Sequence, residues 1–351
     1  MPHNPASPME SLRQIAKVMA EQKRKLKQFL KEGIKKVPVS DEVLEKLVSI
    51  GGWEEHEIMS CHPGYDLERK IKSVQRALET YRRSHADLIT RLDEFDAASK
   101  DGTLFDRPRT AELREHEEAC RKEIFTLSCA AAALVALARR VTASITVPRF
   151  HEVRTKNFDE GQHKFITDLR VQLNHVTFFD SNWSINVNWS TKGTGPVQTS
   201  HFEFKAATLI RDGEFSGEAK AYIREQQDRI DIRNLFETYS KSVQNFYAWL
   251  VPEIEARLPA EVQDYRRCIR ARRANQARFR YRILFAQVVK PETDLYGHLQ
   301  KYLTPEELEE IDALPHRSKQ QIDRVIEMID EYGACDDELR GLVYKAFGLI
   351  M

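Results

Sequence analysis

The feature that most constrains the fold is a long predicted helix, residues 111–143, whose second half is apolar on nearly every side. This half runs from Phe125 to Ala138 and contains four consecutive alanines. A helix without a polar face must be covered on most sides, and alanines let a second helix approach closely. The sequence therefore places this helix at the centre of a helical bundle. Its uncharged stretch, Ile124 to Leu137, covers 14 residues. Because roughly 20 are needed to span a bilayer, we expect no contact with a membrane.

The charge balance excludes a polyanion-binding signature spread over the whole chain, because 54 Lys and Arg residues cancel 54 Asp and Glu residues. Any such signature must be local. The five cysteines form no Cys-x-x-Cys pair, which is typical of reduced intracellular thiols and not of disulfides or a zinc site. We therefore expect neither a metal ion nor a cofactor. The chain starts without a basic segment followed by an apolar run, so we expect it in the cytoplasm.

Helical periodicity dominates the rest of the chain, so the fold class is mainly α. Ser40 is a predicted N-cap for one helix, and Thr304 followed by Pro305 is a predicted start for another. Besides 111–143, we predict helices over residues 10–32, 41–50, 65–98, 158–178, 215–258 (one helix or two), 260–289, 305–313, 316–332 and 336–349, with a helix or turn at 205–212.

One β-hairpin, at about residues 183–204, is inserted in this helical pattern. Trp183, Ile185, Val187 and Trp189 alternate with polar residues, and a Gly-rich turn separates them from a second extended segment. The exposed aromatic side chains either cap the bundle or face a ligand. Since an isolated hairpin needs a surface to pack on, capping is the favoured interpretation.

Three regions are expected along the chain. Residues 1–104 form an N-terminal helical region, residues 105–259 form the bundle with its hairpin, and residues 260–351 form a basic helix followed by acidic C-terminal helices. The bundle is thus expected to carry additional helices at both ends.

The basic helix has two interpretations. In the first, it is an RNA-binding track in which arginines contact phosphates and aromatic rings stack on bases. In the second, it is a solvated face that pairs with the acidic residues at 306–338. The residues of the RNA track are Arg266, Arg267, Arg270, Arg273, Arg278, Phe279 and Tyr281, and Arg272, Arg280 and Arg282 belong to the same charge run.

The predicted helix 158–178 carries a candidate catalytic pair, Arg170 and His175. Imidazole is suited to proton transfer near neutral pH, and a guanidinium can hold a phosphate. Five helical steps rotate a side chain by about 140°, so the two residues meet only if the long Arg170 stem bends toward the imidazole. The structural alternative is that Arg170 pairs with an acid and His175 caps the helix C-terminus.

The pattern Arg170-x4-His175 on a helix that follows a long apolar helix resembles the HEPN superfamily of helical bundles. Residues 112–250 also resemble a set of uncharacterised bacterial proteins. The likeness rests on three segments: Ala138-Arg139-Arg140, the run Phe165-Ile-x-Asp-Leu-Arg170, and Tyr239-x6-Phe246-Tyr247-x-Trp249.

This resemblance implies a metal-independent endoribonuclease, or an RNA-binding protein, of a bacterial toxin or antiphage system. His175 would act as the general acid–base and Arg170 would stabilise the phosphate. Active members carry a polar residue directly after the Arg, where this chain has Val171, and Asn174 would take its place. Two motifs meet across a dimer in the superfamily, so the expected partners are RNA and a second copy. The alternative is a non-catalytic helical module that binds a protein partner and has lost the nuclease chemistry.

Overall fold

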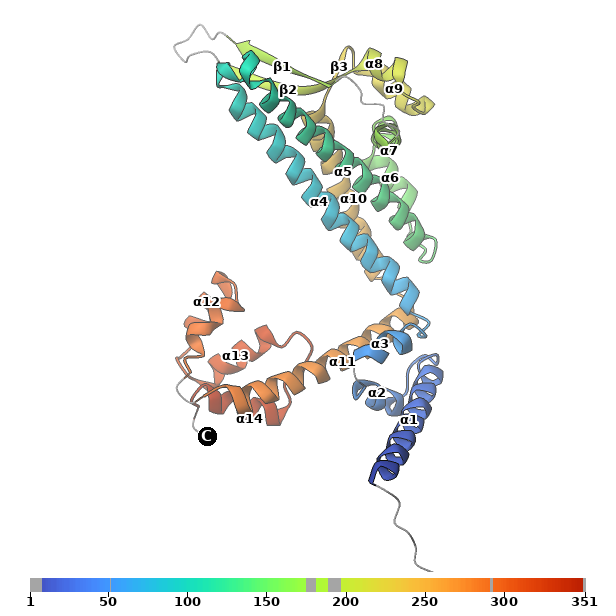
Figure 1. Cartoon of the computed structure of the whole chain (residues 1–351), viewed down its shortest axis with the longest axis vertical. Helices are drawn as coiled ribbons and strands as arrows, with labels where there is room; N and C mark the ends of the chain where they lie inside the picture. The colour runs from blue at the N-terminus through green and yellow to red at the C-terminus, as the bar shows by residue number, and fades with distance from the viewer. Residues whose placement is uncertain (1–7, 51, 175–180, 189–196, 291–292, 350–351) are drawn as a thin grey trace, which may run out of the picture. The chain divides into compact units, whose positions relative to one another are not determined.

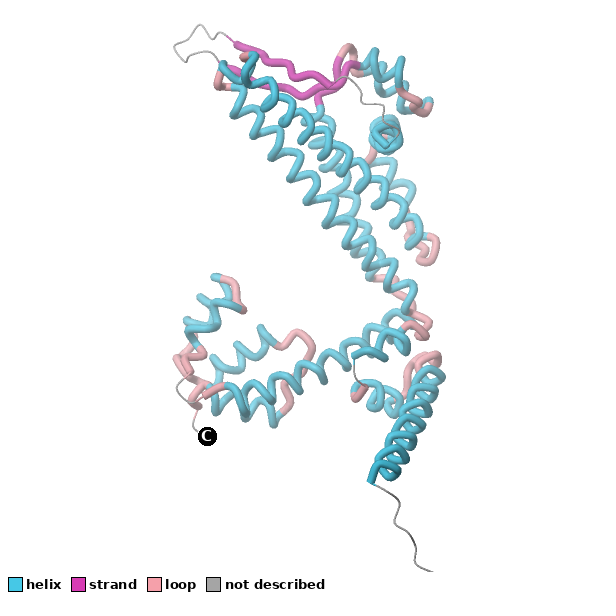
Figure 2. The backbone as a smooth tube through the Cα atoms, in the orientation of Figure 1, coloured by secondary structure: helices cyan, strands magenta, loops and turns pink. Residues whose placement is uncertain are grey.

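The computed structural model describes residues 8–50, 52–174, 181–188, 197–290 and 293–349. It is mainly helical with one small antiparallel sheet, as the sequence predicts (Figures 1 and 2). The chain forms two compact units. Unit 1 comprises Met1–Asp66 and Pro259–Met351, and unit 2 comprises Leu67–Leu258.

Three long helices run along one another in unit 2: α4 (Tyr65–Ser99), α5 (Thr110–Thr142) and α10 (Ile232–Glu255) (Figure 1). The hydroxyls of Tyr81 and Ser240 are 2.8 Å apart and join α4 to α10. The Tyr247 hydroxyl donates to the Leu134 carbonyl oxygen at 3.2 Å and joins α10 to α5. The 3-10 helices η1 (Gly102–Phe105) and η2 (Arg107–Arg109) connect α4 to α5.

The apolar half of α5 packs against α7 (Glu160–Asn174). The buried residues Leu127, Ala131 and Leu134 are on this half, as the sequence predicts for a central helix. By length and composition alone, the helix over Arg107–Thr142 also qualifies as a membrane span, and 44% of its most apolar window is buried inside the protein. A core helix of a soluble protein passes the same test, so this weak signal leaves the absence of membrane contact a prediction.

A three-stranded antiparallel sheet covers one end of the bundle (Figure 2). Strands β1 (Ser181–Asn188) and β2 (Val197–Lys205) form the predicted hairpin, and β3 (Arg229–Asp231) adds to β2. The Trp183 ring stacks on Phe95 of α4, with ring centroids 3.3 Å apart, and also contacts Phe202 on β2. Trp183 therefore caps the bundle, whereas Trp189 lies outside the described residues.

Short elements account for the differences from the predicted helices. The helix predicted over 215–258 is two helices, α9 (Gly217–Glu225) and α10, separated by β3. Two further helices, α3 (Gly52–Met59) and α6 (Phe150–Asn157), were not predicted. Both are eight residues long, and neither sequence shows a clear apolar face. Helix α8 (Ala206–Asp212) occupies the segment predicted as a helix or turn.

The two units do not follow the expected boundary at residue 104. Residues 1–104 are divided at Asp66, because most of α4 packs within unit 2. Residues 259–351 share a unit with 1–66, since α11 (Ala260–Ile283) packs against the N-terminal helices. Unit 2 is therefore inserted in the sequence between the two segments that form unit 1.

Unit 1 has an N-terminal core built by α1 (Pro8–Gly33), α2 (Asp41–Val48), α3 and α11. Leu30, Leu47 and Cys268 are fully buried in it. Ser40 caps α2 as predicted, because its side chain accepts a hydrogen bond from the Val43 amide.

Arg272 of α11 is the largest buried side chain of this core, with 1% of its surface exposed. Its guanidinium donates to the carbonyl oxygens of Leu47 at 3.1 Å and Ile50 at 3.0 Å. These carbonyls lie at the end of α2, where helix geometry leaves backbone acceptors without partners. The third guanidinium nitrogen, Nε, forms an ion pair with Glu55 at 3.0 Å.

The second core of unit 1 lies at the other end of α11. It is formed by the π-helical turn η3 (Leu284–Val288), η4 (Tyr296–Lys301), α12 (Pro305–Asp312), α13 (Lys319–Ile329) and α14 (Asp337–Ala346). Ile311, Ile322 and Leu339 are buried in it. Thr304 and Glu307 form a complete capping box at the start of α12, which confirms the predicted helix start.

We expect Arg272→Met to lower the free energy of unfolding by about 2–4 kcal/mol, because it leaves two carbonyls and a carboxylate without their donor. The matched control is Arg270→Met, since Arg270 is exposed on the same helix, and we expect it to change stability by less than about 0.5 kcal/mol. Urea unfolding followed by circular dichroism measures both. Equal losses for the two variants would contradict this assignment.

Candidate functional site

The predicted pair Arg170 and His175 is described only in part. Arg170 lies on α7, half-buried, and its charge lowers the pKa of Cys129 on α5, although burial of this thiol has the larger, opposite effect. The Arg170 Nε is buried and has no hydrogen-bond partner among the described residues. Asn174 is the last residue of α7, and His175 lies outside the described residues. The catalytic role of these three residues therefore stays a prediction.

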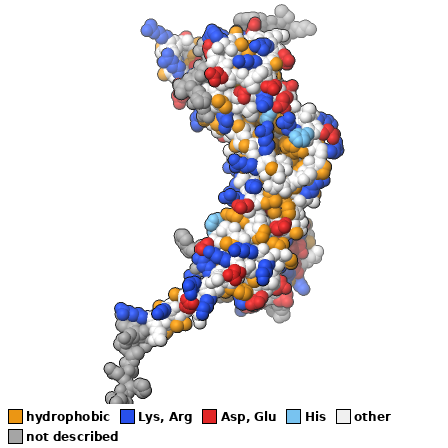
Figure 3. All heavy atoms as spheres, turned by 90° about the vertical axis from the view of Figure 1, so that its right-hand side faces the viewer, with side chains coloured by type: hydrophobic (Ala, Val, Ile, Leu, Met, Phe, Trp, Pro, Cys, Tyr) orange, Lys and Arg blue, Asp and Glu red, His pale blue; other side chains and the backbone are white. Residues whose placement is uncertain are grey.

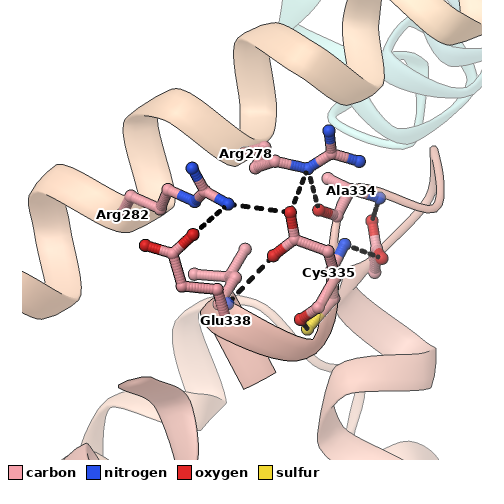
Figure 4. Close-up of polar contacts among 8 residues, drawn as sticks. Arg278, Arg282, Ala334, Cys335 and Glu338 are labelled. Atoms are coloured by element: carbon pink, nitrogen blue, oxygen red, sulfur yellow. Dashed lines mark hydrogen bonds and ion pairs between the residues drawn. The ribbon is translucent and has the colours of Figure 1, made fainter. Parts of the chain in front are cut away.

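Part of the basic run on α11 pairs with the acidic C-terminal region (Figure 4). Arg278 Nε lies 3.0 Å from the Asp336 carboxylate and donates to the Ala334 carbonyl oxygen at 3.0 Å. Arg282 contacts Asp336 at 2.9 Å and Glu338 at 2.6 Å. These contacts support the intramolecular interpretation for this end of the run.

Other arginines of the run also make contacts within unit 1. Arg267 binds the Asp264 carboxylate at 2.9 Å. Arg273 donates to the Tyr332 hydroxyl at 3.2 Å and lies over its ring at 5.4 Å from the centroid. Tyr281 packs against the C-terminal core, so it is not an open stacking platform.

The remaining residues of the predicted RNA track have more solvent contact. Phe279 is 66% exposed, Arg270 is exposed and Arg266 is half-buried. Their contact with RNA stays a prediction. Most of the other arginines and aromatic residues of the predicted RNA track have partners within unit 1. Helix α11 is therefore a weaker candidate for RNA binding than the cleft of unit 2 described below.

His62, Asp264 and Cys268 form a buried group whose candidate ligand atoms all lie within 4.8 Å of one another. The contacts of these residues account for the group without a metal ion. The Gly64 amide donates to His62 Nδ1 at 3.0 Å, and His62 Nε2 lies 3.3 Å from Asp264 Oδ2. That oxygen also accepts from the Val39 amide at 2.8 Å. Burial raises the pKa of the Cys268 thiol to about 11.

A cleft in unit 2 has a volume of about 810 Å³. It lies where the C-terminal end of α5, helix α6, the start of α7 and α10 come together. Apolar and aromatic side chains, including Phe150 and Phe158, form part of its wall. Its charged and titratable lining residues are Arg139, Arg149, Arg154, His151, His163, Glu152 and Glu160.

Two arginines of the cleft are oriented by carboxylates. Arg149 precedes α6 with a left-handed backbone (φ 62°) and makes two hydrogen bonds to Glu152, at 2.9 and 2.6 Å. A positive φ at a residue other than glycine is uncommon and is concentrated at functional positions. Arg154 donates to Glu160 at 3.1 Å, but its Nε is buried without a hydrogen-bond partner among the described residues.

His163 is the buried imidazole of the cleft, with 7% of its surface exposed. Its Nδ1 lies 2.9 Å from the Tyr239 hydroxyl, which fixes the ring. Burial lowers the pKa of His163, and Arg154 and Arg139 add to this effect, whereas Glu160 opposes it. His163 is therefore neutral at pH 7. When Nδ1–H donates to the phenol oxygen, Nε2 carries the lone pair that a general base requires.

In comparisons with known proteins, the chain matches no family model, no curated protein and no solved structure. The likeness to the HEPN superfamily thus stays a prediction. Sequence reasoning named Arg139 only within the Ala138-Arg139-Arg140 segment and did not single out Arg149, Arg154 or His163. The available signal was the density of Arg and His between residues 139 and 163.

We expect the free energy of unfolding to fall between pH 7.5 and pH 5.5. Burial lowers the pKa of His62, His85 and His163 in the folded protein. The unfolded chain, whose histidines titrate near about 6.5, then takes up protons first. This stability is complete above pH 6.5 and is lost as the pH falls toward the folded-state pKa.

The substitution His62→Gln isolates the contribution of His62 to this effect. It should make the free energy of unfolding depend less steeply on pH. His56→Gln, at an exposed position of the same unit, controls for the loss of an imidazole. Urea titrations at pH 7.5, 6.5 and 5.5 provide the measurement. An unchanged slope in His62→Gln would show that His62 is not buried as a neutral group.

Proposed function

We propose that the bundle of unit 2 binds single-stranded RNA in the 810 Å³ cleft and cleaves it without a metal ion. One observation carries this proposal: three arginines and two histidines from four neighbouring segments line the same cleft. Its volume lies in the range of about 300–1,000 Å³ that is common for ligand sites.

Phosphate is the anion that this lining favours. Guanidinium groups bind phosphate oxygens with two parallel hydrogen bonds, and the Arg154 side chain lines the cleft with 32% of its surface exposed. Phe150 and Phe158 pack against Phe246 and lie half-buried in the same wall, where their remaining exposed surface would contact bases. Two glutamates balance part of the positive charge, so the ligand competes with Glu152 and Glu160 for their arginines.

The chemistry that fits two imidazoles is transfer of the phosphodiester to the neighbouring 2′-hydroxyl. His163 removes the 2′-OH proton, and the resulting oxygen attacks the adjacent phosphorus. His151 donates a proton to the 5′-oxygen as its bond to phosphorus breaks. The products are a 2′,3′-cyclic phosphate and a free 5′-hydroxyl. Arg154 stabilises the charge on the pentavalent phosphorus.

This assignment keeps the reaction class expected from the HEPN resemblance but changes the residues. His163 and Arg170 are both on α7, seven residues apart, so they project from nearly the same face at about 10 Å along the axis. The two assignments therefore differ by two helical turns on one helix. Substituting His163 and Arg170 one at a time distinguishes the two assignments.

We expect Arg139→Ala to weaken binding of single-stranded RNA by roughly 10-fold and to lower the slope of log affinity against log salt by about 1, because it removes one phosphate contact. Arg140→Ala is the matched control, since Arg140 is adjacent and exposed but does not line the cleft. Fluorescence polarisation at several salt concentrations measures both. Equal effects of the two substitutions would contradict binding in the cleft.

Cleavage is tested with the same RNA in EDTA. We expect His163→Gln to reduce the rate at least 100-fold with RNA binding retained, because it removes the general base. Arg170→Ala should retain activity. The reverse pattern would move the reaction to the predicted Arg170 motif. Binding without cleavage by the wild-type protein would support the alternative of a bundle that has lost the nuclease chemistry. Gel analysis of the cyclic phosphate product provides the readout.

A further inference from the structure

The N-terminal half of α1 leaves an apolar stripe exposed to solvent. The stripe is formed by Ile15, Val18 and Met19, which are 55%, 52% and 64% exposed. Their spacing places them on one face of the helix. The same face continues to Leu26 and Leu30, which pack into the N-terminal core of unit 1. Helix α1 thus extends beyond the elements that cover its other half.

The C-terminal core of unit 1 carries an apolar pocket of about 330 Å³. Val325, Leu339 and Val343 lie in its wall, and Val288 and Tyr302, which are 60% and 72% exposed, also line it. Asp330 is one of few polar lining residues. Its carboxylate accepts hydrogen bonds from the Ala334 and Cys335 amides at 2.7 and 2.8 Å, so it is bound to backbone donors. The pocket is therefore suited to aliphatic side chains.

The charges around these two surfaces are complementary. Helix α1 contains seven basic and three acidic residues, whereas residues 281–347, which include the pocket lining, contain eight basic and fourteen acidic residues. In the described part of the chain, five of these acids already form ion pairs: Glu310, Asp323, Glu327, Asp336 and Glu338. Figure 3 shows basic side chains beside hydrophobic ones on α1, toward the lower left of the view. The apolar stripe of α1 is complementary to the apolar pocket, and the basic charge of α1 is complementary to the acidic charge of the segment around the pocket.

We propose that α1 of a second copy of this chain docks its Ile15–Val18–Met19 stripe into this pocket. Residues at i, i+3 and i+4 are the usual anchors of a helix in an apolar groove. We take a second copy as the occupant because every copy carries both complementary surfaces, the basic α1 and the acidic segment around the pocket. Each chain offers one α1 and one pocket, so reciprocal docking closes a two-fold dimer with two identical contacts.

The molar mass of the full chain in solution tests this arrangement. Light scattering at tens of micromolar protein should give a dimer that dissociates as salt is raised. Met19→Asp, which places a carboxylate in the contact, and Val288→Asp, which places one in the pocket, should each give a monomer. Ala20→Asp adds the same charge at the adjacent, exposed position on another side of α1 and should remain dimeric.

Mixing the two monomeric variants provides a stricter test. Met19→Asp retains an intact pocket and Val288→Asp retains an intact α1, so the mixture should form a heterodimer through one restored contact. A wild-type monomer overturns the proposal, as does a dimer that both substitutions leave intact. A wild-type monomer that binds anionic lipid vesicles, and loses this binding in Met19→Asp, would assign the stripe to a membrane surface. RNA binding is also measured on the monomeric variants. Because the cleft is in unit 2 and the docking surfaces are in unit 1, we expect RNA binding to be retained, so that the two proposals can fail independently.

Discussion

Unit 1 depends on polar contacts that α11 makes to a segment more than 200 residues earlier in the chain. Asp264 accepts the Val39 amide, and Arg272 donates to the carbonyls of Leu47 and Ile50. Burying a carboxylate and a guanidinium is costly unless their polar atoms have partners. Here the partners are the Val39 amide, two carbonyls at and just after the end of α2, and the Glu55 carboxylate. Closing the intervening loop adds little entropic penalty, because this penalty grows slowly with loop length.

Unit 2 depends instead on apolar surface. Neither α4 nor α5 is held by its own sequence preference alone, since most helical stability in proteins comes from packing of an apolar face. The apolar half of α5 ends at Ala138, and the basic pair Arg139 and Arg140 follows directly. The cleft therefore lies where charged residues first interrupt this apolar surface, which continues past them to the buried Val141. Its charged side chains are positioned by the ends of helices, and its aromatic wall continues the core.

The sequence predicted those parts of the fold that depend on local patterns. Long helices have apolar periodicity, and Ser40 and Thr304 cap through their own side chains. The short elements α6 and β3 lack such periodicity and are held by tertiary contacts, so they were not predicted. The cleft was missed for a related reason, because His163 acquires its properties only when Tyr239 of another helix lies beside it. Likewise, no local pattern says that Arg278 pairs with Asp336.

Among the polar atoms of unit 2 that are buried without hydrogen-bond partners in the described residues are two arginine nitrogens, Arg154 Nε and Arg170 Nε. A buried donor without a partner costs about 1–3 kcal/mol, and the packing of the bundle must offset this cost. An anion that reaches either guanidinium recovers part of it, and this gain is available only to the folded state. Binding and folding are then linked, since a ligand that binds the folded state raises its stability by mass action. Under the proposed function, an anionic ligand that contacts these arginines of α6 and α7 would therefore stabilise the bundle.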